Sequence, residues 1–393
     1  MIKKTDITEL FCDAKRKNTY LKVCAPMVRY SKVQFRSLVR NYGVDLTFTP
    51  MILANSFCQN SKARSNEFQT TSNDTPLIVQ FAANNVHDFL DASKLVYPYA
   101  DGVDLNCGCP QRWAIKDGYG CALLSQPEII HDIVRSVKRN LPNDFTVSVK
   151  IRIMNELKKT LLLCQQLEKC GINFMTVHGR LPSQKNSEPI DVTSLVDIFE
   201  TVQIPCIVNG GVKKLDDADE LYESLKCDGV MAASGILTNP AMFSGAQKTP
   251  MKCVKLWMDY KNLSSDNITF QCYHHHLVFM LEKILNRQQK QIFNYLSTFE
   301  EVDRYLFSVF GLDQLHSILE KDYDDVGELV LCEYDNNITM KHNKKCRGCG
   351  KSNFYCGCTT YNCDDGHGSF YSSFIKITDE LDYMDTNMFN ELL

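Results

Sequence analysis

The sequence lacks any apolar run long enough to cross a membrane. Its longest runs, such as residues 161–164, contain only a few residues, whereas a spanning helix needs about 20. The opening residues lack the apolar core and cleavage site of a secretory leader. We therefore expect a soluble protein with no membrane partner, located in the cytoplasm and/or the nucleus, whose 18 cysteines are free thiols.

Acidic residues are scarce where the C-terminal region is richest in cysteine. Residues 341–363 contain no acidic side chain, whereas residues 299–340 carry 11 acidic and 2 basic side chains. Residues 1–298 carry 35 basic and 29 acidic side chains. The net charge of -4 therefore does not exclude a polyanionic ligand for this larger part of the chain. An ordinary solvated surface followed by an acidic tail explains the same distribution.

Eight short apolar runs recur along the chain, each followed by a helix-like stretch. Their spacing of about 23 to 45 residues is that of a strand plus a crossover helix, so the pattern predicts an α/β fold, a closed (β/α)₈ TIM barrel. A doubly wound sheet needs fewer strands and usually a glycine-rich turn after the first, where this chain has Ala25-Pro26-Met27. The predicted strands are residues 21–27, 46–51, 77–82, 103–106, 146–152, 174–178, 206–209 and 229–233.

The regular spacing of predicted strands ends near residue 250, and this point divides the chain. We predict a barrel over residues 1–245, a small all-helical domain over 246–312, and an irregular acidic, Cys-rich extension over 313–393. Within the second part, residues 273–290 have the apolar spacing of one amphipathic helix. We expect the protein to be monomeric.

Polar side chains lie at the ends of several predicted strands. Gln80, Asn106, Lys150, His178 and Asn209 all fall at strand ends, and barrel enzymes build their sites at the C-terminal ends of the strands. Each of these groups is costly to bury without a partner, which favours a site over packing. Glycine-rich turns follow the last two predicted strands, where barrels bind phosphate through backbone N–H groups.

A tight corner follows the fourth predicted strand. Gly108 and Pro110 force a turn, so Cys107 and Cys109 should project from the tip of the strand. One thiol is a candidate acid or nucleophile. The alternative is that both are small buried apolar side chains, the usual state of a free cysteine.

In order and spacing, these motifs resemble the tRNA-dihydrouridine synthases over residues 20–310. The matching motifs are Ala25-Pro-Met27, Phe35-Arg36, Gln80-Phe81, Asn106-Cys-Gly-Cys-Pro110, Gly118-Tyr-Gly-Cys-Ala-Leu-Leu124, Lys150-Ile-Arg152, His178-Gly-Arg180, Asn209-Gly-Gly211, Asp228-Gly-Val-Met231 and Asn239-Pro240. Residues 249–253, 286–290 and 293–294 resemble the eukaryotic subgroup that acts at positions 20a and 20b of the tRNA D-loop.

The resemblance implies an oxidoreductase that uses NADPH and FMN to reduce the C5–C6 double bond of a tRNA uridine to 5,6-dihydrouridine. It implies that Lys150 stabilises the anionic reduced flavin at the barrel mouth. Where the family commonly has Arg, this chain has Ser234, so one charged phosphate contact is missing. The implied FMN contacts are Pro26, Met27, Val28, Gln80, Lys150, His178, Asn209, Gly210, Gly211, Ala233, Ser234 and Gly235.

The reduction needs a hydride at C6 and a proton at C5 of the uracil. A thiol with an ordinary pKa of about 8.5 is mostly protonated at neutral pH, so Cys109 is the expected catalytic acid, and Cys107 is expected to be structural. The uridine must leave its stack, so a basic rim and a mobile loop around residues 112–120 are expected. The expected substrate contacts are Asn106, Arg112, Lys116, Arg152, Arg180, Lys283, Arg287 and Lys290.

The C-terminal cysteines lie outside the resemblance. Cys346, Cys349, Cys358 and Cys363 are candidate ligands for one Zn²⁺ ion, and a tail whose thiols are incidental is the alternative. Two other functions are consistent with parts of the pattern: a flavin barrel oxidoreductase that acts on a small pyrimidine or enone, and a catalytically idle RNA-binding barrel.

Overall fold

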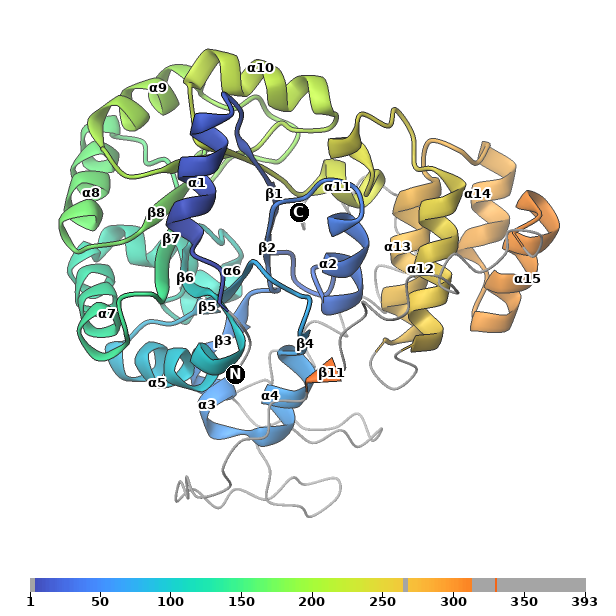
Figure 1. The fold of residues 1–393 in the computed structure, drawn as a ribbon, viewed down its shortest axis with the longest axis horizontal. Coiled ribbons are helices and arrows are strands. Elements are labelled where there is room, and N and C mark those ends of the chain that lie inside the picture. The colour runs from blue at the N-terminus through green and yellow to red at the C-terminus, as the bar shows by residue number, and fades with distance from the viewer. Residues whose placement is uncertain (1–3, 264–267, 313–328, 331–393) are drawn as a thin grey trace.

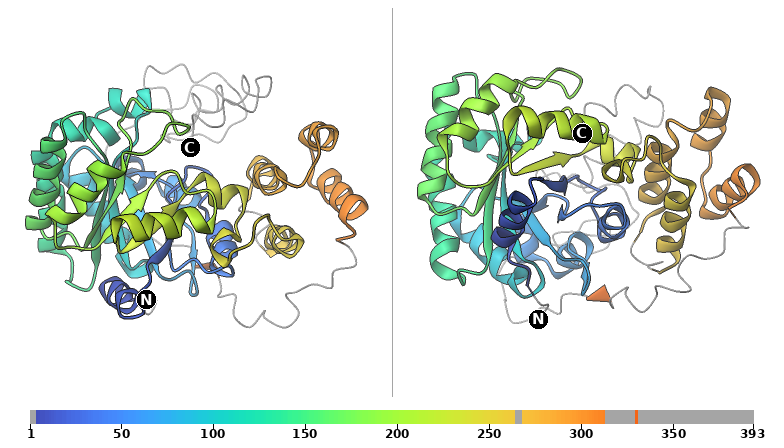
Figure 2. Two further views of the ribbon diagram at one scale, coloured as in Figure 1. Left: turned by 90° about the horizontal axis from the view of Figure 1, so that it is seen from above. Right: turned by 45° about the horizontal axis from the view of Figure 1, so that its top comes forward.

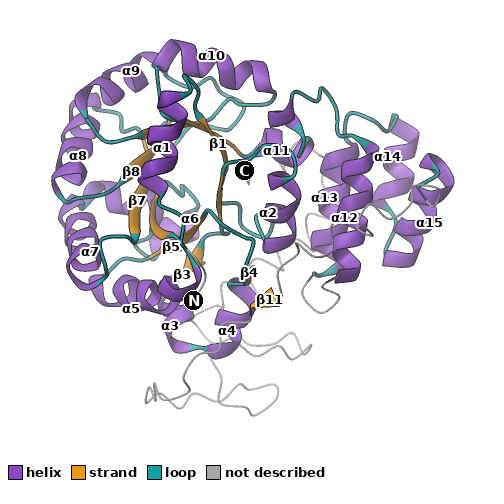
Figure 3. Cartoon of the chain, in the orientation of Figure 1, coloured by secondary structure: helices purple, strands orange, loops and turns teal. Residues whose placement is uncertain are grey.

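The computed structural model describes residues 4–263, 268–312 and 329–330, and its centre is a closed barrel of parallel strands. The strands pair in the order β2-β1-β10-β9-β8-β7-β6-β5, and β2 also pairs with β5, which closes the ring. Figure 3 shows the strands inside a ring of helices, so the predicted (β/α)₈ barrel is confirmed. The barrel strands are β1 (Leu21–Cys24), β2 (Leu46–Phe48), β5 (Leu77–Ala82), β6 (Gly102–Cys107), β7 (Thr146–Arg152), β8 (Phe174–His178), β9 (Cys206–Asn209) and β10 (Gly229–Ala232).

The outer helices bury one apolar stripe each against the strands. On α7, Ile130, Ile133, Val134 and Val137 recur at helical spacing and are fully buried. The helices around the barrel are α2 (Val33–Arg40), α5 (Val86–Val96), α7 (Pro127–Asn140), α8 (Leu157–Lys169), α9 (Val192–Thr201), α10 (Leu215–Leu225) and α11 (Ser234–Thr238). Between β2 and β5 lie β3 (Ile52–Leu53), α3 (Ala54–Gln59), α4 (Ser61–Glu67) and β4 (Thr70–Thr71), which pairs antiparallel with β11 (Leu329–Val330).

Helix α1 (Ile7–Arg16) closes the N-terminal end of the barrel. Its N-cap Asp6 accepts hydrogen bonds from two backbone N–H groups, and its buried face packs inward. The Phe11 ring lies 5.4 Å from that of Phe174, the first residue of β8. Because this end is filled, only the opposite end, where the strands finish, is available for a site.

Four helices project from one side of the barrel in Figures 1 and 2: α12 (Met251–Leu263), α13 (Phe270–Leu281), α14 (Arg287–Asn294) and α15 (Phe299–Phe310). An aromatic cluster joins them to the barrel. The His276 ring of α13 stacks on Phe35 of α2 at 4.5 Å and lies 4.4 Å from the Trp257 ring of α12. His276 Nε2 also pairs with the carbonyl of Tyr30, in the loop after β1. This histidine is therefore a packing residue.

The prediction of a single helix over residues 273–290 is wrong. Helix α13 ends at Leu281 and α14 begins at Arg287. The side chains of Asn286 and Gln289 cap each other's backbone N–H groups, which starts a new helix at this point. The predicted apolar stripe therefore extends over two helices and the turn between them.

Candidate active site

The polar residues predicted to form a site meet at the C-terminal end of the barrel. Asn106 of β6 is the register partner of Lys150 of β7, and His178 of β8 is the partner of Asn209 of β9. Lys150 Nζ donates to Asn209 Oδ1 at 3.0 Å, and the Asn209 amide in turn donates to the Met231 carbonyl at 2.9 Å. All four polar side chains are buried, so each is held by the barrel itself.

Three buried cations surround this point. Lys150, Arg152 and Arg180 form no ion pair with a carboxylate of the described residues; the two arginines donate to backbone carbonyls. Burial, followed by the charge of Arg152, lowers the pKa of Lys150 to about 8. The charges of Asp104 and Glu188 act on Lys150 and Arg180 without forming an ion pair, so three buried positive charges are only partly balanced, and the arrangement fits an anionic ligand.

His178 is neutral in this surrounding. Burial is the main cause that lowers the pKa of His178, and the charges of Lys150, Arg152 and Arg180 lower it further. A guanidinium can only donate, so the 3.0 Å contact between Arg180 Nη1 and His178 Nε2 makes that nitrogen an acceptor. The ring proton is therefore assigned to Nδ1.

A pocket beside His178 has the properties of a phosphate site. A Cβ on Gly210, whose φ is +113°, would lie 2.7 Å from Ile190 Cγ2, and one on Gly235 would lie 2.4 Å from the Val212 carbonyl oxygen. The pocket lining contains two cationic side chains and no carboxylate. It consists of His178, Arg180, Asn186, Asn209, Gly210, Gly211, Val212, Lys213, Met231, Ala233 and Ser234.

This lining fits the phosphate of FMN, because exposed backbone and positive charge are what a phosphate needs. It brings Arg180, predicted to contact tRNA, together with residues predicted to contact the flavin. Sequence reasoning did not single out Asn186 or Lys213. Lys213 lies two residues after the Asn209-Gly210-Gly211 turn, and that proximity was the available signal.

The corner after β6 places its two thiols differently. Cys107 is fully buried, which raises its pKa well above the ordinary value, whereas Cys109 is partly exposed. Burial also raises the pKa of Cys109, although Arg152 and Lys150 oppose this. The Cys109 thiol is therefore protonated at neutral pH. The structural role expected for Cys107 agrees with its burial.

The loop after β1 is fixed from two sides. Met27 is buried, and its backbone N–H donates to Ser31 Oγ at 3.0 Å. The Ser31 carbonyl accepts from Arg36, whose guanidinium forms a buried ion pair with Asp74. Pro26 and Val28 flank Met27 and are partly exposed, so this loop presents a fixed apolar surface at the rim.

Sequence reasoning missed Asp104 and Ser148. Gln80, Asp104 and Ser148 are register partners on β5, β6 and β7, and all three are buried. The Asp104 carboxylate accepts from Gln80 Nε2 at 2.8 Å and from Ser148 Oγ at 2.7 Å. Burial raises the pKa of Asp104 to about 6.

The remaining predicted substrate contacts lie on helices or in the turn between two helices. Arg112 and Lys116 are exposed on α6 (Arg112–Lys116), so the loop expected over residues 112–120 is partly helical. Lys283 is exposed in the turn between α13 and α14, and Arg287 is exposed at the start of α14. Lys290 forms an ion pair with Glu282 at 2.8 Å.

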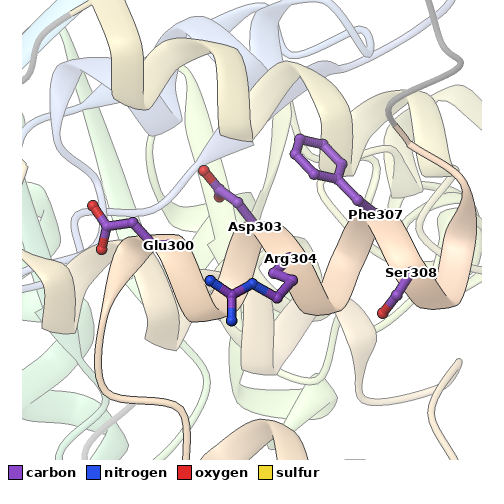
Figure 4. Close-up of a pocket in the computed structure, with 5 residues that line it drawn as sticks. All are labelled: Glu300, Asp303, Arg304, Phe307 and Ser308. Atoms are coloured by element: carbon purple, nitrogen blue, oxygen red, sulfur yellow. The ribbon is translucent and has the colours of Figure 1, made fainter.

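A surface hollow over α15 is distinct from the barrel site. Glu300, Asp303, Arg304, Phe307 and Ser308 line it, and Figure 4 shows them along one helix. Asp303 is already bound by Lys261 and by the Tyr273 hydroxyl. No convergent set of polar groups comparable to the barrel rim is present there.

The four cysteines predicted to bind zinc lie outside the described residues, as does most of the predicted extension. Within the described ranges the cysteines are free thiols, and no group of three or more metal-ligating side chains occurs. None of the helices described is both long and apolar enough to span a bilayer.

Comparison with known proteins gives one consistent result. The profile of the dihydrouridine synthase (Dus) family matches residues 23–323. A Mus musculus protein named tRNA-dihydrouridine(20a/20b) synthase-like is 46% identical over 319 residues, covering 81% of this chain and 96% of that protein. The tRNA-dihydrouridine(20a/20b) synthase of Saccharomyces cerevisiae is 37% identical over 300 residues, covering 74% and 82%. A Rattus norvegicus protein named tRNA-dihydrouridine(16/17) synthase-like is 34% identical over 243 residues, covering 60% and 55%.

Proposed function

The chain belongs to the dihydrouridine synthase family, and we propose on that basis that it reduces a uridine of the tRNA D-loop at position 20a/20b to 5,6-dihydrouridine. The position is favoured by the higher identity and fuller coverage of the 20a/20b relatives than of the 16/17 relative. The observation that supports the reaction is the buried cluster of three cations, none of them in an ion pair with a carboxylate of the described residues, beside a partly exposed, protonated thiol.

Family membership implies a flavin and NAD(P), and we propose FMN with NADPH as its reductant. Bound FMN supplies the hydride that adds to C6 of the uracil. Asn209, Gly210, Gly211, Ala233, Ser234 and Gly235 would hold its phosphate, together with Arg180. Lys150, Gln80 and the loop of Pro26, Met27 and Val28 would hold its ring, and the cation at Lys150 favours an anionic reduced ring.

Cys109 supplies the proton in this proposal. Its Sγ–H bond breaks as the C5–H bond of the uracil forms, which leaves a thiolate at Cys109. Burial raises the pKa of this thiol and the charges of Arg152 and Lys150 oppose that rise, so these cations stabilise the thiolate as it forms. Asn106, whose side chain holds the turn that carries Cys109, keeps the sulfur in place.

The exposed cations of α6 and of the α13–α14 region, above all Arg112, Lys116, Lys283 and Arg287, are proposed to contact tRNA phosphates. We further propose a monomeric protein located in the cytoplasm and/or the nucleus.

The test compares Cys109→Ala with Cys107→Ala in two half-reactions. With Cys109→Ala, NADPH should still reduce the flavin, but dihydrouridine formation in tRNA should fall by about 100-fold or more, the contribution of a general acid. Cys107→Ala, the matched control, should retain both. Equal loss in the two variants would contradict the assignment of the acid to Cys109.

The same preparations separate the two alternatives. Reduction of a free pyrimidine or enone without RNA would favour a small-molecule oxidoreductase. A colourless protein that binds tRNA but not FMN would favour an idle RNA-binding barrel.

A further inference from the structure

One buried carboxylate lies inside the barrel without a cation bound to it. Asp104 is fully buried at the middle of β6, and both its oxygens accept hydrogen bonds from neutral groups, Gln80 Nε2 and Ser148 Oγ. It forms no ion pair among the described residues, although the charge of Lys150 attracts it. A carboxylate in such a position is costly to bury, so its retention needs a reason other than stability.

The hydrogen bonds beyond Asp104 continue to the corner. Asn106 Nδ2 donates to Gln80 Oε1 at 2.9 Å. The other end of the Asn106 amide, Oδ1, accepts from the backbone N–H groups of Gly108 at 3.1 Å and Cys109 at 3.0 Å. A single chain of bonds thus runs from Asp104 through two amide side chains to the backbone of Cys109.

The direction of this chain is set at Asp104 and, at the other end, by the backbone N–H groups of Gly108 and Cys109. An ionised carboxylate only accepts, so the Gln80 amide must present its NH₂ group to Asp104 and its oxygen to Asn106. Asn106 must then turn its own NH₂ group toward Gln80 and its oxygen toward the corner. In the opposite orientation, the NH₂ group of Asn106 would face two N–H donors, and the turn at Cys109 would lose both bonds.

The side-chain amide of Gln80 can still form further hydrogen bonds. Gln80 uses one of its two amide protons and one of its two oxygen lone pairs in these bonds, so a proton and a lone pair remain for a ligand at the rim.

We propose that Asp104 is a positioning residue for the reduction: it fixes the orientation of the Gln80 and Asn106 amides and thereby the turn that carries Cys109. This inference rests on the proposed role of Cys109 as the proton donor. Asp104 itself touches neither the uracil nor the flavin in this scheme.

The experiment measures the two half-reactions of the flavin-loaded protein separately. Asp104→Ala should slow reoxidation of the reduced flavin by tRNA about 10- to 100-fold, the effect of a small misplacement of a reacting group. Reduction by NADPH should fall much less than reoxidation, because hydride transfer to the flavin does not use the thiol. Asp104→Asn should restore reoxidation, since its amide oxygen accepts from Gln80 while its NH₂ group donates to Ser148.

Two controls separate positioning from damage to the core. Ser148→Ala removes the other partner of Asp104 and should leave reoxidation unchanged, because the carboxylate still accepts from Gln80. Alkylation of Cys109 by iodoacetamide, followed by peptide mass spectrometry, should be faster in Asp104→Ala as the turn loosens, while alkylation of the exposed Cys12 should not change.

If Asp104→Ala does not fold, the double variant Asp104→Asn, Ser148→Ala carries the test. It nearly preserves volume but leaves the amide of residue 104 without a fixed orientation, so reoxidation should be slower than in either single variant. Unchanged reoxidation in Asp104→Ala or in the double variant, or equal loss of both half-reactions, would overturn the positioning role. If the unchanged protein forms no dihydrouridine, or Cys109→Ala retains full activity, the proposed function fails instead.

Discussion

Lys150, Arg152 and Arg180 are buried together at the barrel rim, and none of them forms an ion pair with a carboxylate in the part of the chain that the structure describes. Such an arrangement costs stability unless a ligand supplies the negative charge. The pocket beside them has the exposed glycine backbone that a phosphate needs, but Ser234 contributes no charge. The charge balance of this rim therefore predicts how strongly the flavin is held.

Ser234→Arg is expected to tighten FMN binding by about 10-fold, because a charge-assisted contact to phosphate contributes about 1.5 to 3 kcal/mol, part of which is lost in ordering the new side chain. Ser234 is exposed, so the larger side chain does not disturb the core. Quenching of flavin fluorescence measures the dissociation constant. Riboflavin, which lacks the phosphate, is the control ligand, and equal tightening of riboflavin would contradict the explanation.

The pKa of Lys150 predicts that the affinity for FMN depends on pH. With its pKa lowered to about 8, the side chain is cationic below that pH and loses its charge as the pH rises through it. The dissociation constant of FMN should therefore increase as the pH is raised from about 7 to about 9. Lys150→Met should bind FMN more weakly at neutral pH and show a flatter profile over the same range. A persistent rise centred near pH 8 in this variant would assign the titration to another group.

Helix α1 shows how a single element confines the site to one end of the barrel. Its Ile7 and Phe11 are buried against the N-terminal ends of the strands, at the opposite end of the barrel from the residues of the rim. Stability and flavin binding should therefore be separable by substitutions in this helix.

Phe11→Ala is expected to lower the free energy of unfolding by about 3 to 5 kcal/mol, the cost of removing a buried aromatic ring. Urea denaturation followed by circular dichroism measures the loss. Thr8→Ala on the exposed face of α1 is the matched control and should change stability by less than about 0.5 kcal/mol. The FMN dissociation constant of folded Phe11→Ala should be unchanged, and a large change would show that α1 supports the rim.

The elements were predictable where one physical signal dominated. Each strand-plus-helix unit repeats the same burial pattern, so the barrel could be predicted from spacing alone. The break between α13 and α14 could not, because the apolar stripe continues through Ile284 and Leu285, although α13 has already ended at Leu281 and the capping box of Asn286 and Gln289 starts a new helix. Asp104 was missed because a polar residue that alternates with apolar ones usually faces solvent, whereas both faces of a barrel strand are buried.

At the scale of the whole molecule, the cations proposed to contact tRNA lie on different parts of the fold. Arg112 and Lys116 belong to the barrel side and Lys283, Arg287 and Lys290 to the projecting helices. A single RNA bound to both parts would be held largely by phosphate contacts, whose strength depends on salt.

Replacing Lys283, Arg287 and Lys290 with alanine should weaken tRNA binding and reduce the slope of log affinity against log salt by up to about 2 to 3, since each phosphate contact contributes about 0.7 to 0.9. Lys290 should contribute least because it is paired with Glu282. Filter binding at several salt concentrations measures the slope. Alanine at Arg139, Lys158 and Lys169, exposed on α7 and α8, is the control with equal charge loss. Equal slopes for the two triple variants would place the RNA elsewhere.

The aromatic cluster of Phe35, Trp257 and His276 has a practical consequence for separating catalysis from RNA recognition. A fragment that stops at residue 245 would leave Phe35 facing water and remove the partner of the Tyr30 carbonyl, so it should aggregate rather than behave as a minimal reductase. The two activities should therefore be dissected by point substitutions in the intact polypeptide and not by truncation.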